Sequence, residues 1–377
     1  MRSPISRRWL MIASSLCALS LVVAACGGSD NSSSSSGSSS SSSSSAKADK
    51  VAVLLPDTKS SVRWETADRP LLTQAFKAAG VPVEIQNAQG DKSTQQQQAE
   101  QAITNGAKVL LLVNLDSGSG AAIEANAKSQ GVKVIDYDRL TLGGSADYYV
   151  SFDNVAVGKL QGQGLVNCLQ KGGGPAKPKI AELNGSPTDN NATLFAQGYN
   201  SVLNPLYKAG KAVKVADQSV PDWDNQKALT IFEQMLQKES NKIDGVLAAN
   251  DGLGNAAISA IKARKLKQIP VTGQDATAEG IQNILAGDQC MTVYKAVKDE
   301  AKAASDAAIA LLNGQTPATT GTVHDDTGNR DVPSVLATPV AIYKDNVKQV
   351  VDDGFVKASE ICTTSALQQA CAAAGIQ

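Results

Sequence analysis

The sequence predicts an α/β protein with two doubly wound lobes, and three observations lead to this prediction. From residue 51 onward, short continuous apolar runs alternate with amphipathic stretches of helical length, which is typical of a parallel sheet covered by helices on both faces. This alternation occurs as two successive sets of similar size and order. About 330 residues follow residue 48, enough for two lobes with hydrophobic cores.

The first set contains five predicted strands and three predicted helices. Each strand is a run of five to seven residues rich in Val, Leu, Ile or Tyr, and each helix repeats apolar residues at helical spacing. The strands are predicted at residues 51–56, 83–88, 109–113, 132–138 and 148–153, and the helices at 70–79, 93–105 and 120–130.

The second set repeats this pattern. Its strands are predicted at residues 179–185, 212–219, 245–251, 270–276 and 290–295, and its helices at 155–169, 192–209, 225–238, 253–264 and 278–286. One more helix at 299–312 and a few strands within 333–343 and 347–356 are too little for a third domain. They must complete the two lobes, so the chain is expected to cross between the lobes more than once.

Residues 1–25 are predicted to be a secretory signal peptide. Three arginines precede an apolar run from Trp9 to Ala25, and small residues end the run. An uncleaved membrane anchor is the alternative, but the run is short for a span. The tetrapeptide VAAC, which ends at Cys26, resembles a bacterial lipobox and implies that Cys26 carries lipid.

A polar tether is predicted over residues 26–48. Residues 32 to 45 are all Ser except Gly37, a composition that cannot bury apolar surface. The folded part is therefore expected outside the cytoplasm, held to the membrane only through the lipid. The balance of 35 basic against 36 acidic residues gives no reason to expect a nucleic-acid partner.

Four of the six cysteines lie beyond the lipidation site. In an exported chain they predict two disulfides, and four cysteines allow three pairings. Our preferred pairing joins Cys168 to Cys290 and Cys362 to Cys371. Their spacing is not that of a metal site, and the sole histidine, His324, lies in a polar segment, so we expect no metal, no haem and no histidine-based catalysis.

Polar side chains recur where the predicted strands end, which is where open α/β sheets bind ligands. Carboxylates and amides accept hydrogen bonds and Asn, Arg and Lys donate them, as the hydroxyls of a sugar require. Trp64 and Trp223, one in each set, are predicted to sandwich a pyranose ring. The strand-end residues are Asp57, Arg63, Trp64, Asn114, Asp116, Asp136, Asp138, Arg139, Asn184, Asp189, Asn190, Asn191, Asp222, Trp223, Asp224, Asn250, Asp251, Gln274, Asp275 and Lys295.

The motifs at these strand ends resemble, in order and spacing, the periplasmic sugar-binding proteins of ABC importers, and most closely the branch of xylose-binding and multiple-sugar-binding proteins. The resemblance extends from residue 51 to about residue 360. It is carried by RWETADR (63–69), VIDYDR (134–139), YVSFDN (149–154), GSPTDNNA (185–192), AAND (248–251), TGQDA (272–276), MTVYK (291–295) and RDVPS (330–334).

This resemblance implies the periplasmic binding protein type I fold, in which two Rossmann-like lobes are joined by a three-segment hinge. The crossings are expected near residues 153–155, 295–298 and 331–334. The implied N-terminal lobe is 49–153 with 298–331, the C-terminal lobe is 154–297 with 332–360, and a tail covers 361–377.

Ten sugar contacts are implied by position within the matching motifs. They are Arg63, Trp64, Asp138 and Arg139 in the N-terminal lobe, and Asp189, Asn191, Trp223, Asn250, Asp275 and Lys295 in the C-terminal lobe. Two departures from the family pattern leave the preferred sugar open: the segment PDTKSSVRW (56–64) has few charges, and Asp222 stands where Gly is usual.

The implied function is that of a monomeric lipoprotein without cofactor or enzymatic activity, which binds a monosaccharide, with xylose preferred, and delivers it to an ABC permease and its ATPase. A sensor that presents the sugar to a membrane receptor is the alternative. A glycoside hydrolase that uses Asp138 and Asp275 is disfavoured because these acids are expected beside Arg and Lys. A transcription regulator is disfavoured by the signal and the tether.

Overall fold

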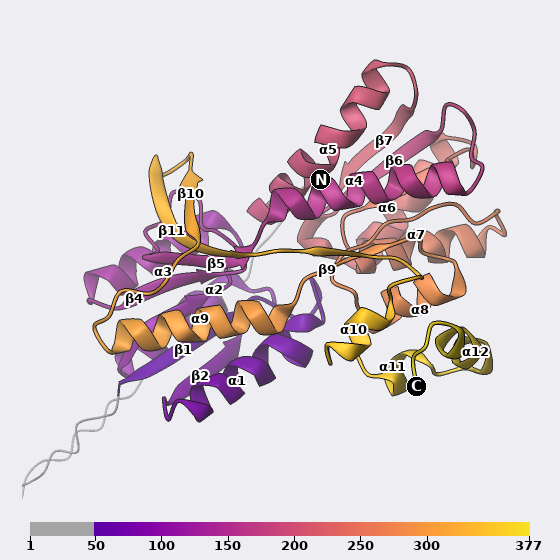
Figure 1. Cartoon of the computed structure of the whole chain (residues 1–377). Coiled ribbons are helices and arrows are strands. Elements are labelled where there is room, and N and C mark those ends of the chain that lie inside the picture. Colours follow the sequence, from indigo (N-terminus) through magenta and orange to yellow (C-terminus); the bar gives the residue numbers. More distant parts are fainter. Residues whose placement is uncertain (1–48) are drawn as a thin grey trace, which may run out of the picture. The chain divides into compact units, whose positions relative to one another are not determined.

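The computed structural model describes residues 49–377 (Figure 1). The predicted signal peptide, the lipidation site Cys26 and the tether up to residue 48 lie outside the described residues. The described residues form one compact unit, within which two lobes are recognised by their separate sheets. Among the described residues, no helix is both long and apolar enough to cross a membrane.

A seven-stranded sheet in the order β10-β11-β5-β4-β3-β1-β2 forms the N-terminal lobe. All neighbours pair in parallel except β10 and β11, which form an antiparallel hairpin. The five predicted strands of the first set are all present. The strands are β1 (Lys50–Leu55), β2 (Val83–Asn87), β3 (Ala107–Leu112), β4 (Lys133–Tyr137), β5 (Tyr148–Phe152), β10 (Gly321–Asp325) and β11 (Arg330–Ala337).

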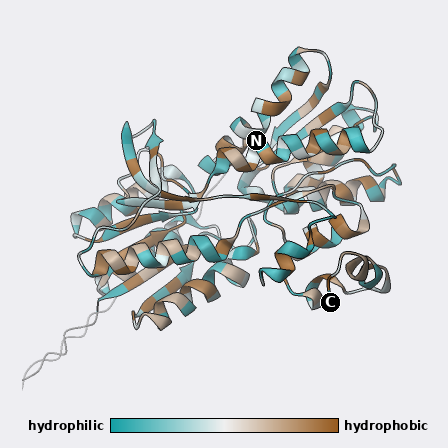
Figure 2. Ribbon diagram, in the orientation of Figure 1, coloured by the Kyte–Doolittle hydropathy of each residue, from teal (hydrophilic) through white to brown (hydrophobic). Residues whose placement is uncertain are grey.

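Helices cover both faces of this sheet, as the continuous apolar strands predict. In β1, Val51 and Val53 pack in one cluster with residues of α1 and α9, whereas Ala52 and Leu54 pack in another with residues of α2 and α3 (Figure 1). The hydropathy colouring shows the same alternation of hydrophobic and hydrophilic faces along the helices (Figure 2). The helices are the π-helix η1 (Trp64–Asp68), α1 (Arg69–Ala78), α2 (Lys92–Thr104), α3 (Ser117–Ser129) and α9 (Val297–Leu312).

The C-terminal lobe has a smaller sheet than predicted. Strands β6 (Lys179–Asn184), β7 (Val213–Ser219) and β8 (Gly245–Ala248) pair in parallel in the order β7-β6-β8. The strand predicted over 270–276 is wrong: only one bridge, from Val271 to Val246, remains.

The backbone explains this loss. Asp275 and Ala276 have φ values of 93° and 51°, outside the extended region, so a strand cannot continue through the polar end of this segment. The strand predicted at 290–295 is shortened to β9 (Thr292–Tyr294), which pairs antiparallel with β12 (Val340–Ile342) in a separate sheet.

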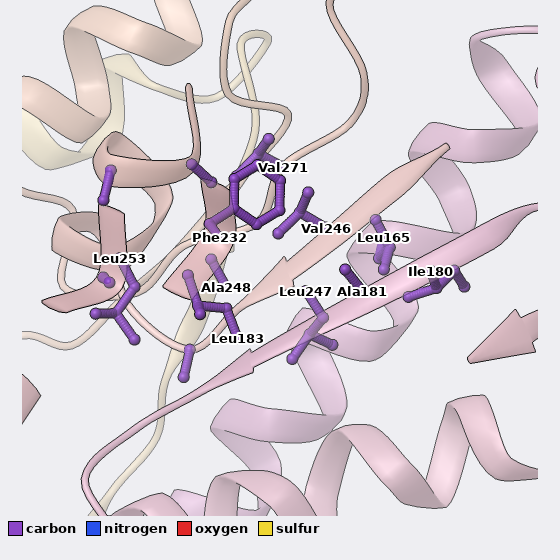
Figure 3. Close-up of a cluster of buried hydrophobic side chains, with 14 of the residues drawn as sticks. Leu165, Ile180, Ala181, Leu183, Phe232, Val246, Leu247, Ala248, Leu253 and Val271 are labelled. Atoms are coloured by element: carbon purple, nitrogen blue, oxygen red, sulfur yellow. The ribbon is translucent and has the colours of Figure 1, made fainter. Parts of the chain in front are cut away.

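The core of this lobe gathers around Leu183, Phe232, Val246 and Leu253 (Figure 3). The helices around it match the predicted ranges closely. They are α4 (Asn154–Lys171), α5 (Asn190–Lys208), the 3-10 helix η2 (Pro221–Trp223), α6 (Asn225–Lys238), α7 (Asp251–Ala263) and α8 (Ala278–Ala286).

Three segments link the two sheets. The first lies between β5 and α4, and the second between β9 and α9, both near the predicted positions. The third crossing was predicted at 331–334, which is wrong. β11 stays paired with β5 as far as Ala337, so the chain leaves the N-terminal sheet only at 338–339, just before β12 (Figure 1). Pairing of residues 331–333 with β10 and of residues 334–337 with β5 holds this segment in the first lobe.

The tail packs onto the C-terminal lobe. Residues 347–356 were expected as a strand but form α10 (Lys348–Asp352) and its flanking turns, followed by α11 (Ala358–Ile361) and α12 (Ser365–Ala373). Together with α8 and β9 they bury an apolar cluster that includes Val350, Ile361 and Cys371. The structure joins Cys362 to Cys371 and Cys168 to Cys290, the pairing preferred from the sequence.

Replacing Cys362 and Cys371 together by Ser is expected to lower the free energy of unfolding by about 2–3 kcal/mol, because the short loop between them is no longer closed in the unfolded chain. Urea unfolding of the double variant beside the wild-type protein measures this difference. Reducing agent should destabilise the double variant less than the wild type, which loses both disulfides; equal losses would show that the bridge between Cys362 and Cys371 contributes no stability.

Candidate functional site

The ten predicted site residues lie at the strand ends of both lobes and form one continuous buried network. None is more than 6% exposed. Arg63 is at its centre in the N-terminal lobe. Its guanidinium donates to the carboxylates of Asp68 (2.8 and 2.9 Å), Asp138 (2.9 Å) and Glu300, and the centre of the group lies 4.6 Å from the centroid of the Trp64 ring.

These acids control the ionisation of Arg63, and Arg63 controls that of Asp138. Burial alone would lower the pKa of Arg63, but the three carboxylates raise it well above its ordinary value. Burial raises the pKa of Asp138, yet Arg63, Lys295 and Arg139 outweigh this effect and hold that pKa below its ordinary value. Arg63 and Asp138 therefore stay charged at neutral pH.

Asp138 also connects the two lobes. It has a φ of 65° in the loop after β4, a conformation that Asp tolerates better than most residues. Asn191, near the start of α5, donates its amide to the Oδ1 atom and to the backbone oxygen of Asp138, both at 3.0 Å. Asn154, at the start of α4, in turn donates to Asn191 at 2.9 Å. The lobes thus meet through a chain of amide and carboxylate groups.

A second contact between the lobes joins Arg139 to Asp189. The Nε atom of Arg139 lies 3.1 Å from Oδ2 of Asp189, the residue that caps α5. The same Oδ2 atom accepts a hydrogen bond from Nε1 of Trp223 at 3.1 Å. Burial raises the pKa of Asp189, although Arg139 opposes this shift. Arg139, Asp189 and Trp223 are therefore brought together from three loops.

Trp223 owes its position to two unusual backbone features. Asp222 and Trp223 both have positive φ values, 60° and 55°, and the Trp223 ring lies so close to Gly185 that a Cβ there would overlap it. Asp222 occupies the position where we expected Gly from the family pattern, and its conformation is one that glycine adopts freely. Its carboxylate forms an exposed ion pair with Lys227 at 2.6 Å.

The remaining predicted residues lie on the other side of the network. Asn250 caps α7 and donates to the backbone oxygen of Ser60 at 3.4 Å. Asp275 accepts from the hydroxyl of Ser61 at 3.4 Å and pairs with Lys295, whose Nζ lies 3.1 Å from Oδ1. All ten residues are thus linked directly or through one neighbour.

Sequence reasoning missed several residues that belong to the same network. The rings of Phe152 and Phe195 lie 5.5 and 5.9 Å from the ammonium of Lys295, one ring from each lobe. Ser60 accepts from both Trp64 Nε1 (3.0 Å) and Arg139 Nη2 (3.2 Å). Phe152 ends a predicted strand and Ser60 lies in a strand-end loop, so the strand-end argument itself could have included both.

Two cavities border the loop that contains Ser60. One, of about 320 Å³, is lined by Arg139 from the first lobe and by Asp189 and Trp223 from the second. The other, of about 270 Å³, is lined by Ser61, Asn250 and Asp275 among others. Space suited to small polar ligands therefore adjoins groups from both lobes.

The chemistry of the network is that of recognition by hydrogen bonds. Arg139 Nε and Asp275 Oδ1 are buried and close to an opposite charge, yet neither makes a hydrogen bond. Buried polar atoms are normally satisfied, and each of these two is satisfied only by its ion pair at 3.1 Å. Among the described residues, no group of three or more His, Cys, Asp and Glu side chains is arranged to hold a metal ion.

Comparisons with known proteins agree with this geometry. A family model described as a periplasmic binding protein domain matches residues 51–316. The chain belongs to the periplasmic binding protein family. The predicted resemblance to that family and the predicted type I fold are both confirmed.

Individual members of the periplasmic binding protein family match most of the chain. The D-xylose-binding periplasmic protein of Escherichia coli is 38% identical over 318 residues, which cover 84% of this chain and 93% of the relative. The multiple sugar-binding periplasmic receptor ChvE of Rhizobium radiobacter is 36% identical, over 83% of this chain and 93% of its own length.

A solved periplasmic binding protein has a similar fold. It is the ABC transporter solute binding protein from Clostridium phytofermentans, whose structure has β-D-glucose bound. It is 30% identical and superposes with a TM-score of 0.77, covering 82% of this chain and 99% of the other.

Proposed function

We propose that this protein is the extracytoplasmic sugar-binding component of an ABC importer, and that it binds an aldopyranose monosaccharide, with D-xylose preferred, between its two lobes. The observation that carries the proposal is the buried network of charged and amide groups contributed by both lobes, which surrounds Arg63, Asp138 and Lys295. Neutral polyhydroxy ligands need donors and acceptors on all sides, and this network offers both.

The relatives support the same ligand class. Proteins named for D-xylose and for multiple sugars match over most of their length, and a solved relative holds β-D-glucose. Ligand binding to groups in both lobes would favour a closed arrangement, because only that arrangement brings both sets of contacts to one sugar. The closed form would then deliver the sugar to the permease and its ATPase, with the protein acting as a monomer tethered by lipid at Cys26.

A glycoside hydrolase is a poorer fit. An inverting or retaining hydrolase needs one carboxylic acid whose pKa is raised so that it can protonate the leaving group. The pKa of Asp138 is instead lowered by Arg63, Lys295 and Arg139 despite burial, and Asp275 is paired with Lys295. We therefore propose no enzymatic activity for this site. A sensor that presents the sugar to a receptor would bind in the same way, and loss of sugar uptake on deleting the permease distinguishes transport from sensing.

Residues 47–377 are expected to be stabilised by one or two aldopyranoses. A ligand at about 1,000 times its dissociation constant adds about 4 kcal/mol to the free energy of unfolding, enough to raise the thermal midpoint by several degrees. A thermal-shift screen of D-xylose, L-arabinose, D-glucose, D-galactose and D-ribose, followed by titration calorimetry of each hit, measures the effect.

Mannitol and a disaccharide serve as controls for nonspecific stabilisation by polyols. If none of the monosaccharides shifts the midpoint or releases heat on titration, the proposed function is wrong. Release of nitrophenol from aryl xylosides or glucosides by the pure protein would favour the hydrolase instead.

A further inference from the structure

Asp251 is a fully buried carboxylate at the start of α7 that is not one of the ten predicted contacts. Its Oδ2 atom accepts hydrogen bonds from the backbone nitrogen of Thr277 at 2.8 Å and from the hydroxyl of Thr277 at 3.1 Å. Its Oδ1 atom accepts from Gln289 Nε2 at 2.8 Å and from the hydroxyl of Thr292 at 2.7 Å. Four neutral donors therefore converge on one side chain.

Two glycines beside Asp251 leave the space that its carboxylate occupies. A Cβ atom added at Gly273 or at Gly280 would overlap its oxygens, so both positions need glycine. Among the described residues, no Lys or Arg forms an ion pair with Asp251. Burial, together with the nearby charge of Asp275, raises the pKa of Asp251 to about 7. Burying a carboxyl group without a neighbouring cation costs free energy of folding, and the four hydrogen bonds to Asp251 offset this cost.

The four hydrogen bonds connect three segments that carry predicted sugar contacts. Asp251 itself follows Asn250, and its backbone nitrogen donates to the oxygen of Gln274 at 3.0 Å, next to Asp275. Thr277 closes the loop that contains Asp275. Thr292 begins β9, the strand that leads to Lys295.

We infer that Asp251 is a positioning residue for sugar binding, which holds the segments of Asn250, Asp275 and Lys295 at the separation that one ligand requires. This inference rests on the proposed function and assigns Asp251 no contact with the sugar. Backbone hydrogen bonds also join these segments: Thr272 donates to Val246 (3.1 Å), and Asp275 donates to Val293 (2.9 Å). The carboxylate of Asp251 adds side-chain connections at the ends of the segments, next to the predicted contacts, and affinity measured apart from stability separates this positioning role from a general structural one.

The chemistry of the donors explains why an amide cannot replace this carboxylate. Gln289 Nε2 also donates to the backbone oxygen of Met291 at 3.1 Å, so two acceptors fix the orientation of its amide group. The Thr277 backbone nitrogen can only donate. Asn has nearly the shape of Asp, but its NH₂ group would face a donor whichever way the amide is turned. One of the three segments would then lose its connection.

The test compares the Asp251→Asn variant with the wild-type protein. We expect the dissociation constant for D-xylose or D-glucose to rise about ten-fold or more, which corresponds to about 1.4 kcal/mol. Titration calorimetry is carried out well below the thermal midpoint of each variant, so that all protein is folded. Hydrogen exchange of the Thr277 amide in the folded variant reports, independently of the ligand, whether the connection to Thr277 is the one that is lost.

Glu182→Gln provides the matched control. Glu182 is another fully buried carboxyl of this lobe whose pKa is raised by burial, but its partners Tyr207 and Lys214 (both at 2.8 Å) are not among the predicted contacts. The control is expected to lose stability without losing affinity. A second variant, Thr292→Val, removes one donor to Asp251 together with the acceptor of the Ala276 backbone nitrogen (3.2 Å), and it is expected to weaken binding about three-fold while leaving the fold intact.

Weaker binding in Asp251→Asn, or in Thr292→Val if the first variant does not fold, with unchanged binding in Glu182→Gln, supports the inference. Wild-type affinity in every folded variant, or equal loss of affinity in the control, overturns it while the proposed function stands. If the wild-type protein binds none of the sugars, the proposed function fails and this inference fails with it.

Discussion

Replacing Arg63 by Met is expected to lower the free energy of unfolding by about 3–5 kcal/mol, the effect of leaving buried charges without their partner. Arg63 is only 3% exposed and contacts the carboxylates of Asp68, Asp138 and Glu300. Asp68 is 0% exposed and Glu300 is 1% exposed. Met fills much of the same volume, so the loss arises from the uncompensated acids rather than from a cavity.

The loss should depend on pH in a definite direction. Burial already raises the pKa of Glu300 well above its ordinary value, and without Arg63 this pKa rises further. The pKa of Asp138 rises as well, because Arg63 is the largest of the charges that hold it below its ordinary value. The folded variant then binds more protons than the unfolded chain. Its stability therefore falls as the pH rises, and the deficit relative to the wild type should be larger at pH 8 than at pH 5.

Urea unfolding of the two proteins at both pH values measures these differences. Lys302→Gln is a suitable control, because Lys302 forms an exposed pair with Asp306 (2.6 Å) that is expected to contribute less than about 1 kcal/mol. A deficit of Arg63→Met no larger than that of the control, or one that grows as the pH falls, would show that Arg63 does not hold the buried acids.

The first lobe was predictable because its strands are buried on both faces. Such strands are continuous apolar runs, so that Val51 to Leu55 and Val109 to Leu112 are recognised without any knowledge of their neighbours. The same reasoning failed at 270–276. Only Val271 of that segment pairs with a strand, and the residues that follow were counted as strand although Asp275 and Ala276 have positive φ.

The third crossing shows a different limit. Residues 331–333 pair with β10, and residues 334–337 remain in the first lobe because they pair with β5, far earlier in the sequence. Nothing in the local sequence distinguishes a strand that ends at residue 331 from one that continues to residue 337. The position where the strand ends depends on the strand it pairs with, and this pairing is set by the tertiary structure of the lobe.

The candidate site was predictable as to residue type and place, because parallel strands bring their carboxyl ends to one edge of each sheet. The hydrogen bonds and ion pairs that connect these residues could not be predicted. Glu300, on α9, contacts Arg63 across 237 positions of sequence, and it follows no strand end, so the strand-end argument gave no reason to include it. Phe195 lies within the predicted helix 192–209, away from any strand end, yet its ring is 5.9 Å from the ammonium of Lys295 as well as part of the core.

Replacing Asp275 by Asn is expected to weaken sugar binding at least about 100-fold, since it removes a buried, charged acceptor and the hydrogen bonds of such groups contribute about 1.5–3 kcal/mol each. Asn is preferred to Ala because residue 275 has a φ of 93°, and Asn tolerates positive φ better than Ala does. The variant also leaves the ammonium of Lys295, which is 5% exposed, without its carboxylate, so the sugar-free protein should lose stability as well.

Combining Asp275→Asn with Lys295→Met separates these two effects. Neutralising a whole buried ion pair is far less destabilising than removing one partner, and Met can pack between the rings of Phe152 and Phe195 that now flank the ammonium. The double variant is therefore expected to recover most of the stability lost by either single variant, as measured by urea unfolding without sugar, while titration calorimetry still shows sugar binding at least as weak as that of Asp275→Asn. Recovery of sugar affinity together with stability would mean that Asp275 and Lys295 only support the fold and do not bind the ligand.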